Sequence, residues 1–166
     1  MYQVAVAIHI SSVVVWLGGM FFLVMVMLPT ARKAMQSGAP EAFGMLSDAA
    51  KKFLPIAWAA MILLGVSGAY LATDHWGIRP NIFFTDDGRF MQILRVKTFL
   101  FLFVVLLSLL HDFWLGPKII ERLEQARQSG EVLPQSQAQK LVRMTAGVNL
   151  LSAVTILVLA VYLIRP

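Results

Sequence analysis

The sequence predicts an all-α integral membrane protein in which four helices form a transmembrane bundle. Hydrophobic residues make up 58% of the 166 positions, charged residues only 14%, and the mean hydropathy is +0.74. A soluble domain of this length needs more charge to stay in solution. Lipid admits only helices or closed barrels, and the apolar runs lack the alternation of barrel strands. The runs are therefore predicted to be helices.

Four apolar runs are long enough, or nearly long enough, for the roughly 20 residues that a membrane-spanning helix needs. The third is the shortest, but Lys97 and Lys118 lie at its ends and their long side chains can reach the interface. No internal repeat or second domain is visible, so we expect one transmembrane domain over residues 1–166. Its predicted spans are about 4–28, 53–73, 96–115 and 145–164.

The first run is predicted to be a retained span and not a cleaved signal peptide. The residues before it, Met1-Tyr2-Gln3, carry no basic side chain, and its length of about 25 residues exceeds that of a signal-peptide core. The chain contains no cysteine, which excludes disulfides and cysteine-based metal or iron–sulfur sites.

Loop charge predicts the orientation. The middle loop, its flanks and the C-terminus carry five Lys or Arg residues, whereas the first and third loops carry nine: Arg32, Lys33, Lys51, Lys52, Lys118, Arg122, Arg127, Lys140 and Arg143. By the positive-inside rule both termini face outward. We expect a multi-pass protein of a bacterial-type inner (cytoplasmic) membrane. The net charge of +5 is explained by these loops and does not indicate nucleic-acid binding.

Small and polar residues inside the spans indicate helix contacts. Gly68 shares one face of the second span with Gly65, Ala69 and Ala72, and Ser12 and Gly19 share a face of the first. Small residues let helices approach closely in lipid. In the fourth span we expect helix-to-helix hydrogen bonds from Asn149, Ser152 and Thr155.

Ionisable residues inside a membrane are costly and therefore indicate function. His9 lies about 8 Å below the outer boundary of the first span, and His111 lies about 21 Å beyond Lys97 along the third. The two histidines are therefore not expected to ligate one iron. Lys97 and His75 are expected at a depth similar to that of His9.

Histidines that face inward in a helix bundle suit haem. An outer haem b would use His9, with His75, Met91 or Lys97 as its second ligand. Arg79, Arg89 and Arg95 could pair with its propionates. An inner haem would use His111 with Met25, Met27 or Met144. Two haems in opposite leaflets would suit electron transfer, whereas with a single haem His111 could instead deliver protons beside Asp112.

Copper is the alternative to haem. Nine methionines and three histidines could bind Cu(I), which favours thioether and imidazole ligands. The methionines are scattered without a paired motif, however, so they are also explained as core-filling residues.

Several motifs resemble a known family. Ile8-His9-Ile10, Val15-Trp16-Leu17-Gly18-Gly19-Met20-Phe21-Phe22, Leu28-Pro29, Leu110-His111-Asp112-Phe113-Trp114-Leu115-Gly116-Pro117 and Val148-Asn149-Leu150 are similar to small copper-resistance D (CopD) family proteins. The spacing of Lys97 and His111 and the ending Leu163-Ile164-Arg165-Pro166 resemble HemJ-type protoporphyrinogen oxidases. The resemblance implies a four-helix core, with haem b binding on the HemJ-type side and copper handling on the CopD side.

The sequence therefore favours a haem-b-binding membrane redox protein, with His9 and then His111 as the main cofactor and metal ligands. Lys97 would orient a propionate or a substrate carboxylate. A copper uptake or tolerance protein is the alternative, and an accessory subunit of a membrane complex is the second alternative. The sequence leaves open whether the protein is an oxidoreductase enzyme. Besides lipid and haem, the partners that the sequence leaves possible are a quinone, a redox protein and a second copy of the chain.

Overall fold

The computed structural model describes residues 1–39, 41–118, 121 and 137–163, and every element in them is a helix. Contacts divide the chain into two compact units, Met1–Thr85 and Asp86–Pro166, which are described separately. The predicted all-α class is confirmed. The prediction of one domain stays a prediction.

Among the described residues, four helices are long and apolar enough to cross a membrane: Tyr2–Ala34, Gly44–His75, Arg89–Lys118 and Met144–Leu163. The first three contain the predicted spans whole and extend beyond them at both ends. The fourth covers its predicted span up to Leu163, because the last predicted residue lies outside the described residues. The first three helices extend beyond their apolar runs because the neighbouring polar residues continue the same backbone hydrogen bonding.

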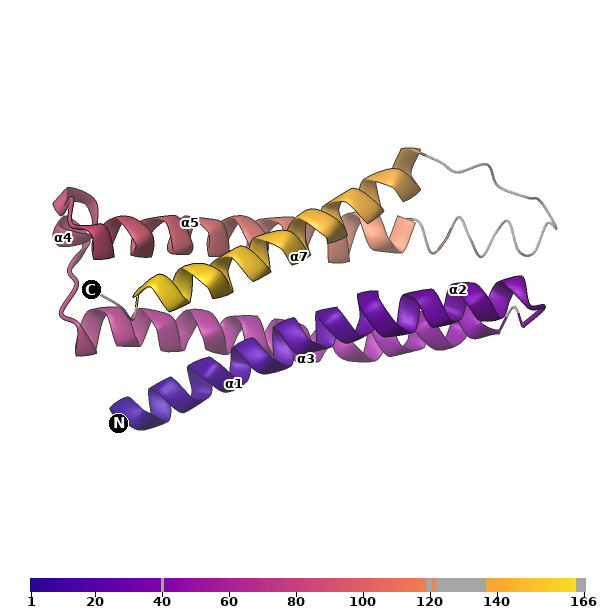
Figure 1. The fold of residues 1–166 in the computed structure, drawn as a ribbon, viewed down its shortest axis with the longest axis horizontal. Helices are drawn as coiled ribbons and strands as arrows, with labels where there is room; N and C mark the ends of the chain where they lie inside the picture. Colours follow the sequence, from indigo (N-terminus) through magenta and orange to yellow (C-terminus); the bar gives the residue numbers. More distant parts are fainter. Residues whose placement is uncertain (40, 119–120, 122–136, 164–166) are drawn as a thin grey trace. The chain divides into compact units, whose positions relative to one another are not determined.

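The first unit is built on two long helices that lie side by side (Figure 1). One consists of α1 (Tyr2–Phe21), η1 (Phe22–Met27) and α2 (Leu28–Gln36), and the other of α3 (Ala42–Tyr70) and η2 (Leu71–His75). A short helix, α4 (Pro80–Thr85), follows. Both α1 and α2 pack against α3.

A glycine ends the first long helix. Gly38 has a φ of 89°, and the Ala39 amide donates to the Ala34 carbonyl at 3.0 Å. This is a Schellman cap, in which the left-handed position is open to glycine without strain. The cap turns the chain back toward α3.

Glycines also bring α1 and α3 into close contact. A Cβ at Gly19 would overlap the ring of Phe53, and a Cβ at Gly68 would lie 3.1 Å from Cε1 of His9. The prediction that small residues mark contacts between helices is confirmed at these two positions. The contact at Gly68 also determines where the imidazole of His9 lies.

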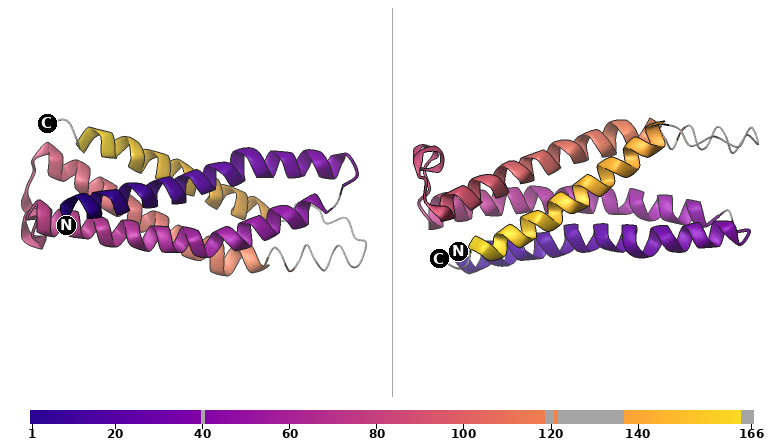
Figure 2. Two further views of the ribbon diagram at one scale, coloured as in Figure 1. Left: turned by 90° about the horizontal axis from the view of Figure 1, so that it is seen from below. Right: turned by 45° about the horizontal axis from the view of Figure 1, so that its top comes forward.

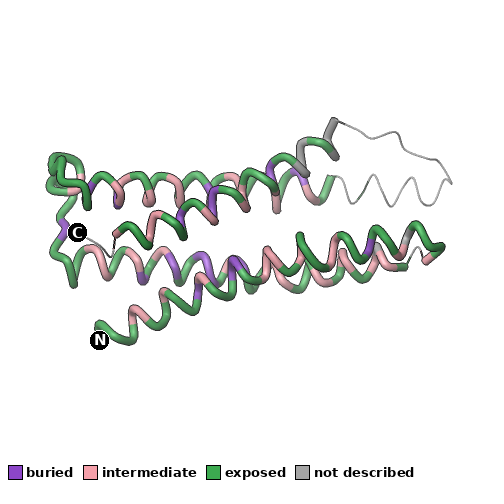
Figure 3. Tube along the Cα trace, viewed as in Figure 1, coloured by how far each residue is buried: buried purple, intermediate pink, exposed green. Residues whose placement is uncertain are grey.

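The second unit pairs one long helix with another. α5 (Arg89–Leu109) continues as η3 (Leu110–Leu115), and both pack against α7 (Gln137–Leu163). α7 crosses α5 obliquely (Figures 1 and 2). Many residues in both units are exposed (Figure 3), and they include large apolar residues such as Val14, Ile62 and Leu106. Lipid-facing helices need such a surface.

Three π-helical segments were not predicted. η1, η2 and η3 each continue the α-helical part of a span, and η2 and η3 contain His75 and His111. A wider turn changes which side chains share a face, and such segments are frequent at functional sites.

Candidate functional site

His9 is held against the neighbouring helix by a serine. It is half-buried on α1, and its Nδ1 lies 3.0 Å from Oγ of Ser67 on α3. Oγ of Ser67 donates its proton within its own helix, to the Leu63 carbonyl at 2.6 Å or the Leu64 carbonyl at 3.2 Å. A hydroxyl carries one proton, so toward His9 the serine oxygen acts as an acceptor. This favours the His9 tautomer with its proton on Nδ1 and its lone pair on Nε2.

Such an arrangement is typical of histidines that bind metals. A ligating imidazole usually donates its second N–H to a fixed acceptor, which sets the tautomer and the ring orientation. Gly68, next to Ser67, gives the ring room to lie against α3, since a Cβ there would come within 3.1 Å of Cε1. Ser67 and Gly68 therefore position the imidazole together.

His75 has a different neighbour. It is exposed, and its ring stacks on Tyr2 with 3.9 Å between the centroids and 24° between the planes. Ser67, which holds His9, lies eight residues earlier on the same continuous helix, or about 12 Å along the axis. The structure thus places His75 beside Tyr2 and not beside His9. The predicted pairing of these two histidines on one iron gains no support.

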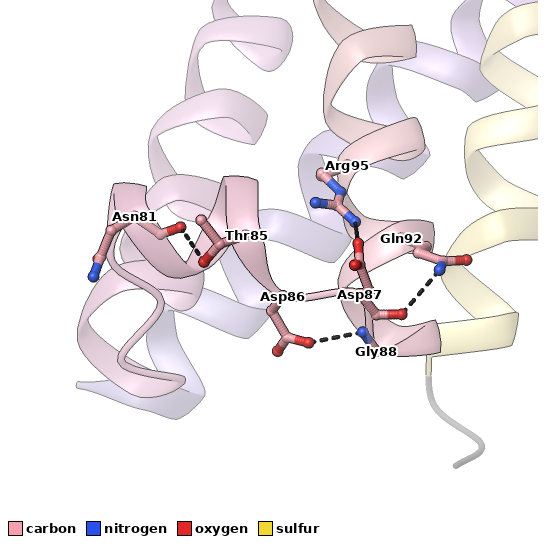
Figure 4. Close-up of polar contacts among 7 residues, drawn as sticks. All are labelled: Asn81, Thr85, Asp86, Asp87, Gly88, Gln92 and Arg95. Carbon is pink, nitrogen blue, oxygen red and sulfur yellow. Dashed lines mark hydrogen bonds and ion pairs between the residues drawn. The ribbon is translucent and has the colours of Figure 1, made fainter.

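Arg95 already has a carboxylate partner. Its Nη2 lies 3.6 Å from Oδ1 of Asp87, whose carbonyl accepts a hydrogen bond from Gln92 at 2.9 Å (Figure 4). Asp86 caps the same turn by accepting from the Gly88 amide at 2.7 Å. The Asp87 side chain is 93% exposed, so the ion pair is weak and can be displaced.

The remaining basic candidates are spread out. Lys97 is half-buried on α5, and Arg79 and Arg89 are exposed. His111 lies 14 residues beyond Lys97 on the same continuous helix, or about 21 Å along the axis. The structure does not bring Lys97 and His111 together.

His111 forms a pair with its neighbour in η3. Its Nδ1 lies 3.0 Å from Oδ1 of Asp112. Its Nε2 is buried and has no hydrogen-bond partner among the described residues. Six residues beyond Asp112, Nζ of Lys118 lies 4.2 Å from the centre of the Trp114 ring. A cation over an aromatic ring suits the end of a span.

The polar residues of the fourth span have separate roles. Nδ2 of Asn149 donates to Oγ of Ser108 on α5 at 2.8 Å, which confirms the expected hydrogen bond between helices. Ser152 is buried. Thr155 is exposed and bonds to the Leu151 carbonyl of its own helix, so the expectation for Thr155 was wrong. A threonine can satisfy its hydroxyl within its own helix by bonding one turn back.

Metal ligands do not cluster in the described part of the chain, where no group of three or more His, Cys, Asp or Glu residues could hold an ion. Met61 and Met91 are buried on different helices, while Met25, Met45 and Met144 are exposed. The burial of Met61 fits the expected core-filling role, whereas the exposure of Met25 and Met45 does not.

A comparison with protein families gives one match. The family model described as copper resistance protein D matches residues 47–163. The matched segment includes Ser67, Gly68 and His111, whereas His9 on α1 precedes it. No match was found among curated proteins or among solved structures.

Proposed function

The chain belongs to the copper resistance protein D family, and from this premise we propose that it handles copper in the membrane with His9 as a copper ligand. Membership supports a membrane protein related to copper resistance. The finer assignment, uptake or tolerance with Cu(I) as the cargo, is our proposal. It replaces haem as the favoured reading because the family match points to copper.

The observation that carries the proposal is the hydrogen bond between His9 and Ser67. It favours the tautomer whose Nε2 lone pair binds a metal, and imidazole is one of the ligands that suit copper. Met61 is buried on α3, but it lies six residues before Ser67, about 9 Å away along the helix. Within the first unit, Nε2 of His9 is therefore the copper ligand that we assign.

A haem b redox protein is the second candidate, and Arg95 is the observation that favours it. Its pairing with an exposed carboxylate is the interaction that a haem propionate would need. His9 in the first unit and His111 in the second are the predicted axial ligands of separate haems, and Lys97 is the predicted contact for a propionate or a substrate carboxylate. The number of haems that this candidate would bind, one or two, remains a prediction.

The metal content of the purified protein tests both candidates. We expect the protein, purified in detergent without added haem, to bind about one Cu(I) per chain in an anaerobic titration with a chromophoric chelator. We expect no Soret band. A Soret band without bound copper would contradict the copper proposal and support the haem candidate, and the absence of both would support the accessory-subunit alternative.

We further propose that both termini face outward in a bacterial-type inner membrane. The chain has no cysteine, so single introduced cysteines report topology cleanly. Cysteine in place of the exposed Ser37 should resist a membrane-impermeant thiol reagent in intact cells, whereas cysteine at Asp87 should react. Labelling after cell lysis is the control for reactivity. The reverse pattern would invert the proposed orientation.

A further inference from the structure

Two buried polar atoms in the second unit have no hydrogen-bond partner among the residues that the structure describes. They are Nε2 of His111 and Oδ1 of Asn149. No other buried side-chain nitrogen or oxygen in the described part of the chain lacks a hydrogen-bond partner. An unpaired polar atom is costly in a membrane interior, where no bulk water can satisfy it. Each such atom therefore needs an explanation.

Both atoms lie along the contact between α5–η3 and α7. The hydrogen bond from Asn149 to Ser108 places these two residues at the same level. His111 follows Ser108 by three residues, less than one helical turn or about 4.5 Å along the axis. η3 packs against α7, so the two unpaired atoms lie along one polar contact. Thr145, one turn before Asn149 on α7, is also buried.

Both atoms are hydrogen-bond acceptors. Asn149 uses its amide NH₂ group toward Ser108, which leaves its carbonyl oxygen as the unpaired atom. His111 has its Nδ1 against a carboxylate, which accepts the Nδ1 proton and leaves the lone pair on Nε2. A guest that satisfies both atoms must therefore supply O–H or N–H donors.

We infer that this contact, comprising Ser108, His111, Asp112 and Asn149, is a binding site for a hydroxyl donor. The shared chemistry fits water or the hydroxyl groups of a membrane-soluble hydroquinone. An oxidised quinone carries only acceptors and would satisfy neither atom. The side chain of His111 is 28% exposed although its Nε2 is shielded, so part of the ring lies at the surface of the unit. The inference does not rest on copper binding at His9, because every residue in its argument belongs to the second unit.

Matched probes test the inference without any substitution. Copper-free protein in nanodiscs would be equilibrated anaerobically with a short-tailed hydroquinone or with its dimethyl ether, which has the same ring but no O–H donor. We expect the hydroquinone to bind at least about tenfold more tightly, which corresponds to about 1.4 kcal/mol. Asn149→Leu and His111→Leu should each remove this preference. Thr155→Val, an exposed change on the same helix, should keep it.

Infrared spectra distinguish water from the organic guest. If the hydroquinone and its ether bind alike, a water occupant predicts an O–H stretching band that shifts in H₂¹⁸O and disappears in Asn149→Leu. Circular dichroism would verify that the variants are folded, and Asn149→Ala would replace Asn149→Leu if that protein misfolds. Equal binding of the two probes, together with no such isotope-sensitive band, would overturn the inference.

Discussion

His9→Ala should weaken Cu(I) binding by more than about 100-fold. Loss of a group that only orients a ligand typically costs about 10- to 100-fold in metal affinity, and removal of the ligand itself should cost more. A competition titration of the purified variant against a Cu(I) chelator measures the change. The helices should stay intact, because a half-buried imidazole is replaced by the best helix-forming residue.

His75→Ala is the matched control for that experiment. Its ring is exposed and stacks on Tyr2, so its loss should leave copper affinity unchanged. Ser67→Ala should give an intermediate loss of about 10- to 100-fold, because Nε2 stays while the partner of Nδ1 is removed. If the folded His9→Ala variant binds Cu(I) as tightly as the native chain, His9 is not the copper ligand and only packs between the helices.

His111→Ala completes the comparison. If His9 alone binds the metal, this variant should keep its copper. If the protein instead binds two haems, one at each histidine, each alanine variant should lose about half of the bound haem. The second result would support the two-site prediction made from the separation of the histidines along their spans.

The spans could be predicted from sequence because the bilayer imposes a simple requirement. About 20 apolar residues in a row leave few alternatives to a helix, and four such runs became four helices. The ends could not be placed closely, since Arg32, Lys33 and Asp48 continue their helices beyond the apolar core. The π-helical segments η1, η2 and η3 could not be predicted either, because no residue pattern in the apolar runs indicates a wider helical turn.

The candidate site was only partly predictable. His9 was identified because an ionisable group in an apolar run is costly. Its partner Ser67 was overlooked, although a polar residue inside the second span was a usable signal. The contact depends on how α1 and α3 are rotated about their axes, and apolar runs specify rotation weakly. Gly68 was identified as a contact residue, but its neighbour His9 could be found only from the paired helices.

The role of this glycine leads to a prediction as large as that for His9 itself. Gly68→Leu should weaken Cu(I) binding by more than about 100-fold although it removes no ligand. A Cβ at this position lies 3.1 Å from Cε1 of His9, so the rest of a leucine side chain must displace the ring and separate Nδ1 from Ser67. Gly68→Ala should cost much less, because the ring needs to move only by a few tenths of an ångström.

Gly18→Leu is the control for Gly68→Leu, since a Cβ at Gly18 has no neighbour within 4 Å. Both variants replace a helical glycine by the same residue, and leucine favours a helix more than glycine does. They therefore differ in what the new side chain meets and not in backbone propensity. We expect Gly18→Leu to bind copper as the native chain does. If folded Gly68→Leu also binds copper normally, the metal does not depend on an imidazole held against α3, because the leucine would have displaced it.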